Sequence, residues 1–124
     1  MAISYLWLAA GGALGTLARY SLSGWVDQRW GAGAWGIFVV NIMGAFLLGL
    51  LATMAEERFL VPADLRRFVT IGFLGAYTTF STLVYESMKM AQLGAFAEAT
   101  ANAVGSLVIG LAAAYLGMVL GRLI

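Results

Sequence analysis

Cysteine and histidine are absent from the 124-residue chain, and proline occurs once, at Pro62. Without thiols or imidazoles, the chain has no disulfide framework, no thiolate nucleophile, no imidazole base and none of the usual zinc or haem ligands. Charged residues make up only 10% of the chain, and the net charge of +1 provides no basic surface for nucleic acid. We therefore predict that the protein is neither an enzyme nor a nucleic-acid-binding protein.

Hydrophobic residues, in contrast, make up 62% of the chain, which is more than the core of a small soluble domain can enclose. The few charges lie at the ends of four uncharged runs, which are Met1–Ala18, Trp30–Ala55, Phe68–Tyr85 and Ala99–Gly121. A helix needs about 20 residues to cross the hydrocarbon core of a bilayer, and each run reaches or approaches that length. The pattern predicts an all-α integral membrane protein with four transmembrane helices.

The predicted helices are Ile3–Leu22, Ala34–Met54, Ala63–Met90 and Ala95–Leu123. Pro62 stands just before the third helix and Asp64 lies in its first turn, as helix starts favour. The first run has no Lys or Arg before it and is too long for the apolar region of a signal peptide, so we expect it to be retained. Residues 1–124 are predicted to form a single four-helix transmembrane domain.

Lysine and arginine are divided almost evenly between the two sides of the predicted bundle. The side with both termini and the second connection holds four of them and the other side holds three, namely Arg58, Arg66, Arg67 and Arg122 against Arg19, Arg29 and Lys89. Because an excess of Lys and Arg normally fixes orientation, this balance permits insertion in both directions. The alternative is that Arg19 is partly buried and does not count, which leaves a modest bias and one fixed orientation.

Polar side chains within the predicted spans need partners, because lipid offers none. The last helix carries a stripe of small and polar residues at steps of three and four, comprising Asn102, Ser106, Gly110, Ala113, Gly117 and Gly121. The stripe is either a contact face between helices or a pore lining. Asn41 in the second helix either hydrogen-bonds a neighbouring helix or offers its amide hydrogens to an anion. Arg19 and Glu86 lie near the ends of their spans, where snorkelling is an alternative to a functional role.

The third helix contains a segment that disfavours continuous helix. Hydroxyl-bearing and β-branched residues follow Gly72 and Gly75, and they weaken a helix at mid-membrane. We predict a non-helical break over Gly75–Thr78. A break frees backbone carbonyls, and no Lys or Arg lies between Arg67 and Lys89 to bind them. The carbonyls are then satisfied either by a bound cation or by threonine hydroxyls and water.

Three motifs in this chain occur together in one known family. They are the glycine-rich segment Gly11–Arg19, the pair Val40-Asn41 followed by Gly44, and the segments Gly72–Gly75 and Thr78–Thr82. In these motifs, in length and in helix count, nearly the whole chain resembles the CrcB, or Fluc, family of fluoride channels. The resemblance implies an antiparallel, dual-topology homodimer, multi-pass in the inner (plasma) membrane. Two antiparallel pores would let fluoride leave the cell passively and would exclude chloride.

The resemblance also implies which residues act. The fluoride pathway would comprise Asn41, Phe80, Ser81, Thr82, Leu83, Asn102 and Ser106, with Arg19 in the vestibule and Glu86 near the far end. Backbone carbonyls of Gly75 and Thr78 from both subunits would hold a structural Na+ at the dimer centre. The chain departs from the family at Leu83, where a second phenylalanine is usual, at Asn102, where tyrosine is frequent, and at Gly110, where a polar residue is common. Since a phenyl edge carries partial positive charge and an isobutyl group does not, Leu83 alters the expected fluoride coordination.

Two other functions fit the length and the helix count. A small four-helix drug exporter depends on an acid in its first helix, and none lies between Met1 and Arg19. A membrane scaffold subunit without transport is distinguished from a channel only by a flux assay.

Overall fold

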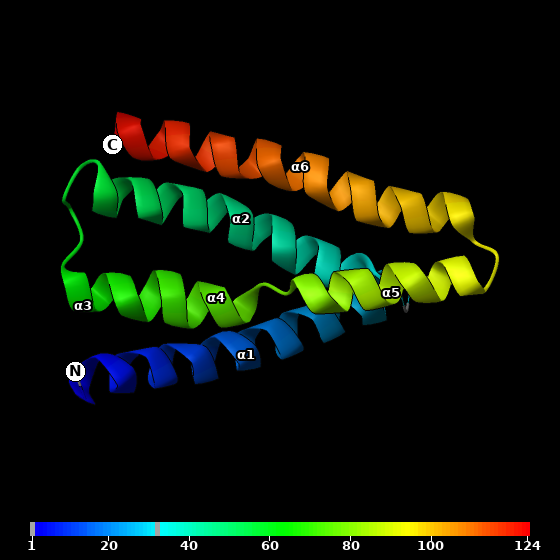
Figure 1. The fold of residues 1–124 in the computed structure, drawn as a ribbon, viewed down its shortest axis with the longest axis horizontal. Coiled ribbons are helices and arrows are strands. Elements are labelled where there is room, and N and C mark those ends of the chain that lie inside the picture. Colours follow the sequence, from blue (N-terminus) through cyan, green and yellow to red (C-terminus); the bar gives the residue numbers. More distant parts are fainter. Residues whose placement is uncertain (1, 32) are drawn as a thin grey trace.

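The computed structural model describes residues 2–31 and 33–124, and within these ranges all regular structure is helical (Figure 1). The elements are α1 Ala2–Trp30, α2 Trp35–Glu56, α3 Ala63–Arg66, the π-helical η1 Arg67–Phe73, α4 Leu74–Tyr77, α5 Phe80–Gln92 and α6 Phe96–Leu123. Because α3, η1 and α4 follow one another without a gap, they form one continuous helical segment, Ala63–Tyr77. This helical segment and α5 together are the predicted third helix, which is broken near its middle. The structure therefore agrees with four helices and a broken third.

Three of the four long helices are both long and apolar enough to cross a bilayer. Trp35–Glu56, Ala63–Gln92 and Phe96–Leu123 meet both length and composition requirements, and the protein is a membrane protein. Helix α1 has 29 residues but includes Arg19, Asp27 and Arg29, and its crossing of the membrane stays a prediction.

Helix α1 ends at Trp30, and the predicted end at Leu22 is wrong. Its extra turns have contacts of their own: the Gly36 N–H donates to Asp27 Oδ1 over 2.8 Å, and the Arg29 guanidinium lies 5.2 Å from the centre of the Trp25 ring. The helix therefore continues beyond the uncharged run. The uncharged run predicts which part of the helix is apolar, but it does not predict the residue at which the helix ends.

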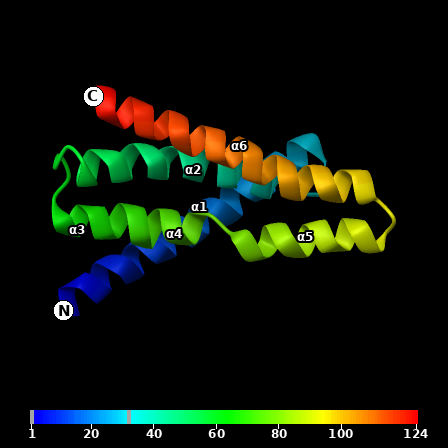
Figure 2. The same cartoon turned by 45° about the horizontal axis from the view of Figure 1, so that its top comes forward.

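Both termini and the α2–α3 connection lie at one end of the bundle, and the α1–α2 and α5–α6 connections lie at the other (Figure 1). Helix α2 packs along α6, while α1 crosses obliquely against η1 and α4 (Figure 2). Small residues permit the close approach. A Cβ atom at Gly117 would overlap the Phe46 carbonyl, and one at Gly121 would lie 2.8 Å from the Leu50 carbonyl oxygen. This end of the α6 stripe is a helix contact face.

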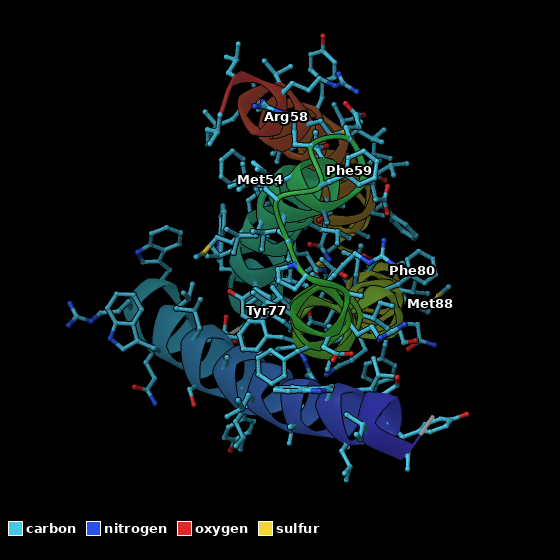
Figure 3. The ribbon with its side chains drawn as sticks, turned by 90° about the vertical axis from the view of Figure 1, so that its left-hand side faces the viewer. Met54, Arg58, Phe59, Tyr77, Phe80 and Met88 are labelled. Atoms are coloured by element: carbon cyan, nitrogen blue, oxygen red, sulfur yellow. The ribbon has the colours of Figure 1, made fainter. Side chains whose placement is uncertain are left out.

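The most buried side chains lie beside the break in the third helix. Val40, Leu74 and Tyr77 are 0%, 2% and 4% exposed and form one cluster. In Figure 3, which looks along the bundle, Tyr77 lies in the interior, whereas Phe80 and Met88 point outward from α5. Phe80 is 77% exposed. The chain thus buries the polar break on one side and leaves it open on the other.

Candidate functional site at the helix break

The break consists of Thr78 and Thr79, whose backbones are extended. The predicted break over Gly75–Thr78 is therefore misplaced, because Gly75 still belongs to α4. Threonine hydroxyl groups bind backbone groups on both sides of the break. Thr79 caps α5: its Oγ1 accepts a hydrogen bond from the Thr82 N–H over 3.3 Å and donates to Thr82 Oγ1 over 3.1 Å. Thr78 Oγ1 donates to the Leu74 carbonyl over 2.9 Å, which closes the last turn of α4.

Asn41 of α2 bridges the break with two hydrogen bonds. Its Oδ1 accepts from the Thr79 N–H over 2.8 Å, and its Nδ2 donates to the Thr79 carbonyl over 3.1 Å. Of the two alternatives for Asn41, the structure shows hydrogen bonds to a neighbouring segment, at the break between α4 and α5. Because Nδ2 carries two hydrogens and uses one here, the other remains free to donate.

Backbone carbonyls of Gly75 and Thr78 lose their helical partners at the break. The amides four residues further on belong to Thr79 and Thr82, and these donate to Asn41 Oδ1 and Thr79 Oγ1 instead. A third freed carbonyl, that of Ala76, accepts from Arg19 Nε over 3.1 Å. No Lys or Arg lies between Arg67 and Lys89 in the sequence, but α1 brings Arg19 to the break from a distant part of the chain.

A groove of about 620 Å³ opens beside the break. Asn41 of α2 lines it, together with Phe80 and Leu83 of α5 and Ser106 and Gly110 of α6. Ser106 is only 6% exposed, and within the described part of the chain its Oγ has no hydrogen-bond partner. This half of the α6 stripe therefore lines a groove, in contrast to the contact face near Gly117. A buried hydroxyl without a partner costs free energy unless a ligand or water binds it.

Other predicted residues lie around the groove, not in its wall. Ser81 is exposed on α5 and Thr82 is engaged in capping. Glu86 is half-buried, and one of its carboxylate oxygens, Oε2, is buried with no hydrogen-bond partner among the described residues. Arg19 lies at the break itself and is half-buried. If Arg19 is not counted, four Lys or Arg remain at one end of the bundle and two, Arg29 and Lys89, at the other.

Asn102 lines a second cavity, of about 430 Å³, between the beginnings of α2 and α6. Its Nδ2 donates over 2.9 Å to Ser87 Oγ, and Ser87 lines the groove. Sequence analysis missed Ser87. Its spacing of one helical turn after Leu83 could have placed it on the same face.

No set of three or more His, Cys, Asp or Glu side chains in residues 2–31 and 33–124 is grouped to hold a metal ion. The oxygen atoms at the break belong to backbone carbonyls, threonine hydroxyls and the Asn41 amide. Those groups, uncharged and oxygen-only, suit hard cations.

Residues 6–118 match the family described as CrcB-like protein, Camphor Resistance (CrcB). The chain belongs to this family. Relatives named fluoride-specific ion channel FluC include those of Acidobacterium capsulatum, which is 42% identical over 97% of both chains, and of Magnetococcus marinus, which is 44% identical over 95% of this chain and 97% of its own. The relative from Thermus thermophilus is 45% identical over 94% of this chain and 92% of its own. These names denote ion channels, in agreement with the prediction that this CrcB-like chain is not an enzyme.

Proposed function

We propose that this protein is a fluoride-selective channel through which fluoride passively leaves the cell. The Ser106 hydroxyl carries the proposal, because it is buried and unpartnered among the described residues and belongs to a residue that lines a groove, in a chain whose relatives are named fluoride channels. Fluoride holds its water strongly, so a selective path must replace that water with hydrogen-bond donors. The groove offers the Ser106 hydroxyl, the free hydrogen of Asn41 Nδ2, and the positive edge of the Phe80 ring.

The functional unit would be an antiparallel, dual-topology homodimer in the inner membrane, with two antiparallel pores. In the single chain Phe80 is 77% exposed and Gly75 lies on an open face beside the freed carbonyls. Non-helical backbone is tolerated at membrane depth only where protein covers it or where it lines a water-filled cavity. A second copy packed against the break would cover these groups and close the groove into a pore. With Arg19 at the break, four Lys or Arg at one end face two at the other, a modest bias against which the second copy would insert in the opposite direction.

A structural Na+ at the centre of the dimer would bind the carbonyls of Gly75 and Thr78 from both subunits. Both carbonyls have lost their helical hydrogen bonds, and a neutral set of oxygen ligands suits a hard monovalent cation. The Arg19 guanidinium bound to the neighbouring Ala76 carbonyl indicates that the electrostatics of the break favour positive charge. The ion would hold the two breaks in place and would not itself be transported.

The purified protein in liposomes loaded with fluoride or chloride tests the channel directly. Rapid fluoride efflux without chloride efflux, followed by ion-selective electrodes, is the expected result. No efflux of either ion would indicate a scaffold, and efflux coupled to a proton gradient would indicate an exporter; either result overturns the proposal. Single cysteines at the two ends of the bundle, labelled from outside, test the topology: labelling of one end only would refute the antiparallel dimer.

The Na+ proposal has its own test. Replacing Na+ with a large organic cation on both sides should lower dimer stability and slow fluoride efflux. If both stay unchanged and the site is empty in an experimental density map, the break is satisfied by hydroxyls and water instead.

A further inference from the structure

One hydrogen bond joins a residue that lines the smaller cavity to a residue that lines the groove. Asn102 lines the cavity of about 430 Å³, Ser87 lines the groove of about 620 Å³, and Asn102 Nδ2 lies 2.9 Å from Ser87 Oγ. Both cavities have walls from α2, α5 and α6. A small ion that passes between them along α5 and α6 would come close to this pair.

The Ser87 hydroxyl is a donor that can change partner. It donates to the Leu83 carbonyl over 2.8 Å while it accepts from Asn102. The Leu83 carbonyl belongs to the continuous helix α5, where it also faces a helical amide, so it can release the hydroxyl at small cost. Rotation about one side-chain torsion would turn the hydroxyl hydrogen toward an anion.

One turn beyond Asn102 on α6 lies Ser106, whose buried hydroxyl has no partner in the described structure. One helical turn is a step of about 5.4 Å, short enough for a desolvated ion to pass between neighbouring donors. Asn102, which lines the smaller cavity, and Ser87 and Ser106, which line the groove, thus provide three neighbouring hydrogen-bond donors.

We propose that Ser87 is a fluoride-binding residue, and that with Asn102 it forms the point at which fluoride passes between the two cavities. The proposal rests on the proposed function. An arriving fluoride would accept the second Nδ2 hydrogen of Asn102, the Ser87 hydroxyl would rotate from the Leu83 carbonyl to the ion, and Ser106 would accept the ion from it. No covalent bond changes; only hydrogen-bond partners do.

Fluoride efflux from liposomes, measured at several fluoride concentrations, tests this role. Ser87→Ala should slow efflux about 10-fold or more and raise the half-saturating fluoride concentration, which is the scale expected when one hydrogen bond to an anion is lost. Ser87→Thr keeps the hydroxyl and should restore efflux. Ser23→Ala is the matched control, because the Ser23 hydroxyl also donates to a carbonyl of its own helix, that of Tyr20, and Ser23 lines neither cavity.

The unmodified protein is measured first, so that the two proposals fail separately. If it passes no fluoride, the channel function fails. If it passes fluoride and Ser87→Ala is equally fast with unchanged half-saturation, only the role of Ser87 fails. Loss of efflux in Ser87→Thr as well would show that packing, and not the hydroxyl, matters. Where Ser87→Ala does not assemble, Asn102→Leu removes the paired donor at similar volume, and full efflux in that variant overturns the proposal.

Discussion

Substitution of Gly44 by alanine should push Thr78, at the break in the third helix, away from α2. Gly44 lies on the face of α2 that meets Thr78 and Tyr77, where a Cβ atom would overlap the Thr78 Cγ2 methyl and lie 3.3 Å from Tyr77 Cδ1. The methyl would have to retreat by on the order of 1 Å to regain ordinary contact. It cannot rotate away freely, because Thr78 Oγ1 on the same carbon donates to the Leu74 carbonyl over 2.9 Å.

The expected cost combines two effects. Overpacking of this kind costs about 1–3 kcal/mol, and loss of the Thr78 hydroxyl bond costs about 0.5–1.5 kcal/mol. Replacing glycine by alanine inside a helix returns about 1 kcal/mol. We therefore expect Gly44→Ala to destabilise the fold by roughly 1–3 kcal/mol and to slow fluoride efflux, because the Thr78 carbonyl and the bond between Asn41 and Thr79 move with the methyl.

Thr78→Ser provides the rescue, because serine keeps the hydroxyl and lacks the methyl. The double variant should recover most of the thermal stability in detergent and most of the efflux lost in Gly44→Ala. Gly24→Ala is the control, since a Cβ atom there meets nothing within 4 Å. A Gly44→Ala protein with normal melting temperature and efflux, or a double variant no better than the single one, would refute the contact between methyl and glycine as the cause.

Three further predictions concern other residues. Asn41→Asp should abolish efflux while the dimer assembles, because a carboxylate would oppose both the Thr79 carbonyl and an anion; normal efflux would remove Asn41 from the pathway. Leu83→Phe should fit the groove and preserve or raise efflux, and a well-assembled variant with strongly reduced efflux would contradict this. The hydrogen bond from Arg122 lowers the pKa of Glu57 below its ordinary 4.5, so the stability from this pair is complete above 4.5 and is lost as the pH falls through the lowered pKa. The melting temperature of Glu57→Gln should fall less over that acid range, and a parallel fall in both proteins would exclude the pair as the source.

The helical class, the number of long helices and the start of the third helix could be predicted from the sequence. These features depend on local properties, which are the length of uncharged runs, a proline before a helix and turn residues such as Gly94, whose φ is +81°. Because a helix must match the thickness of the bilayer, each sufficiently long uncharged run predicts one helix. The motifs that resemble the CrcB family could be recognised for the same reason, since they are short and contiguous.

Tertiary structure decided where the break lies and which groups are satisfied. Gly75 remains helical and Thr79 does not, because Asn41 on another helix binds both backbone groups of Thr79. Arg19 reaches the Ala76 carbonyl across 57 positions of sequence, and Ser87 becomes part of the groove through its bond to Asn102 on α6. Such partners cannot be derived from local pattern, because they depend on which helix faces meet. The contact between α2 and α6 likewise divides one stripe into a packed half at Gly117 and a groove at Ser106.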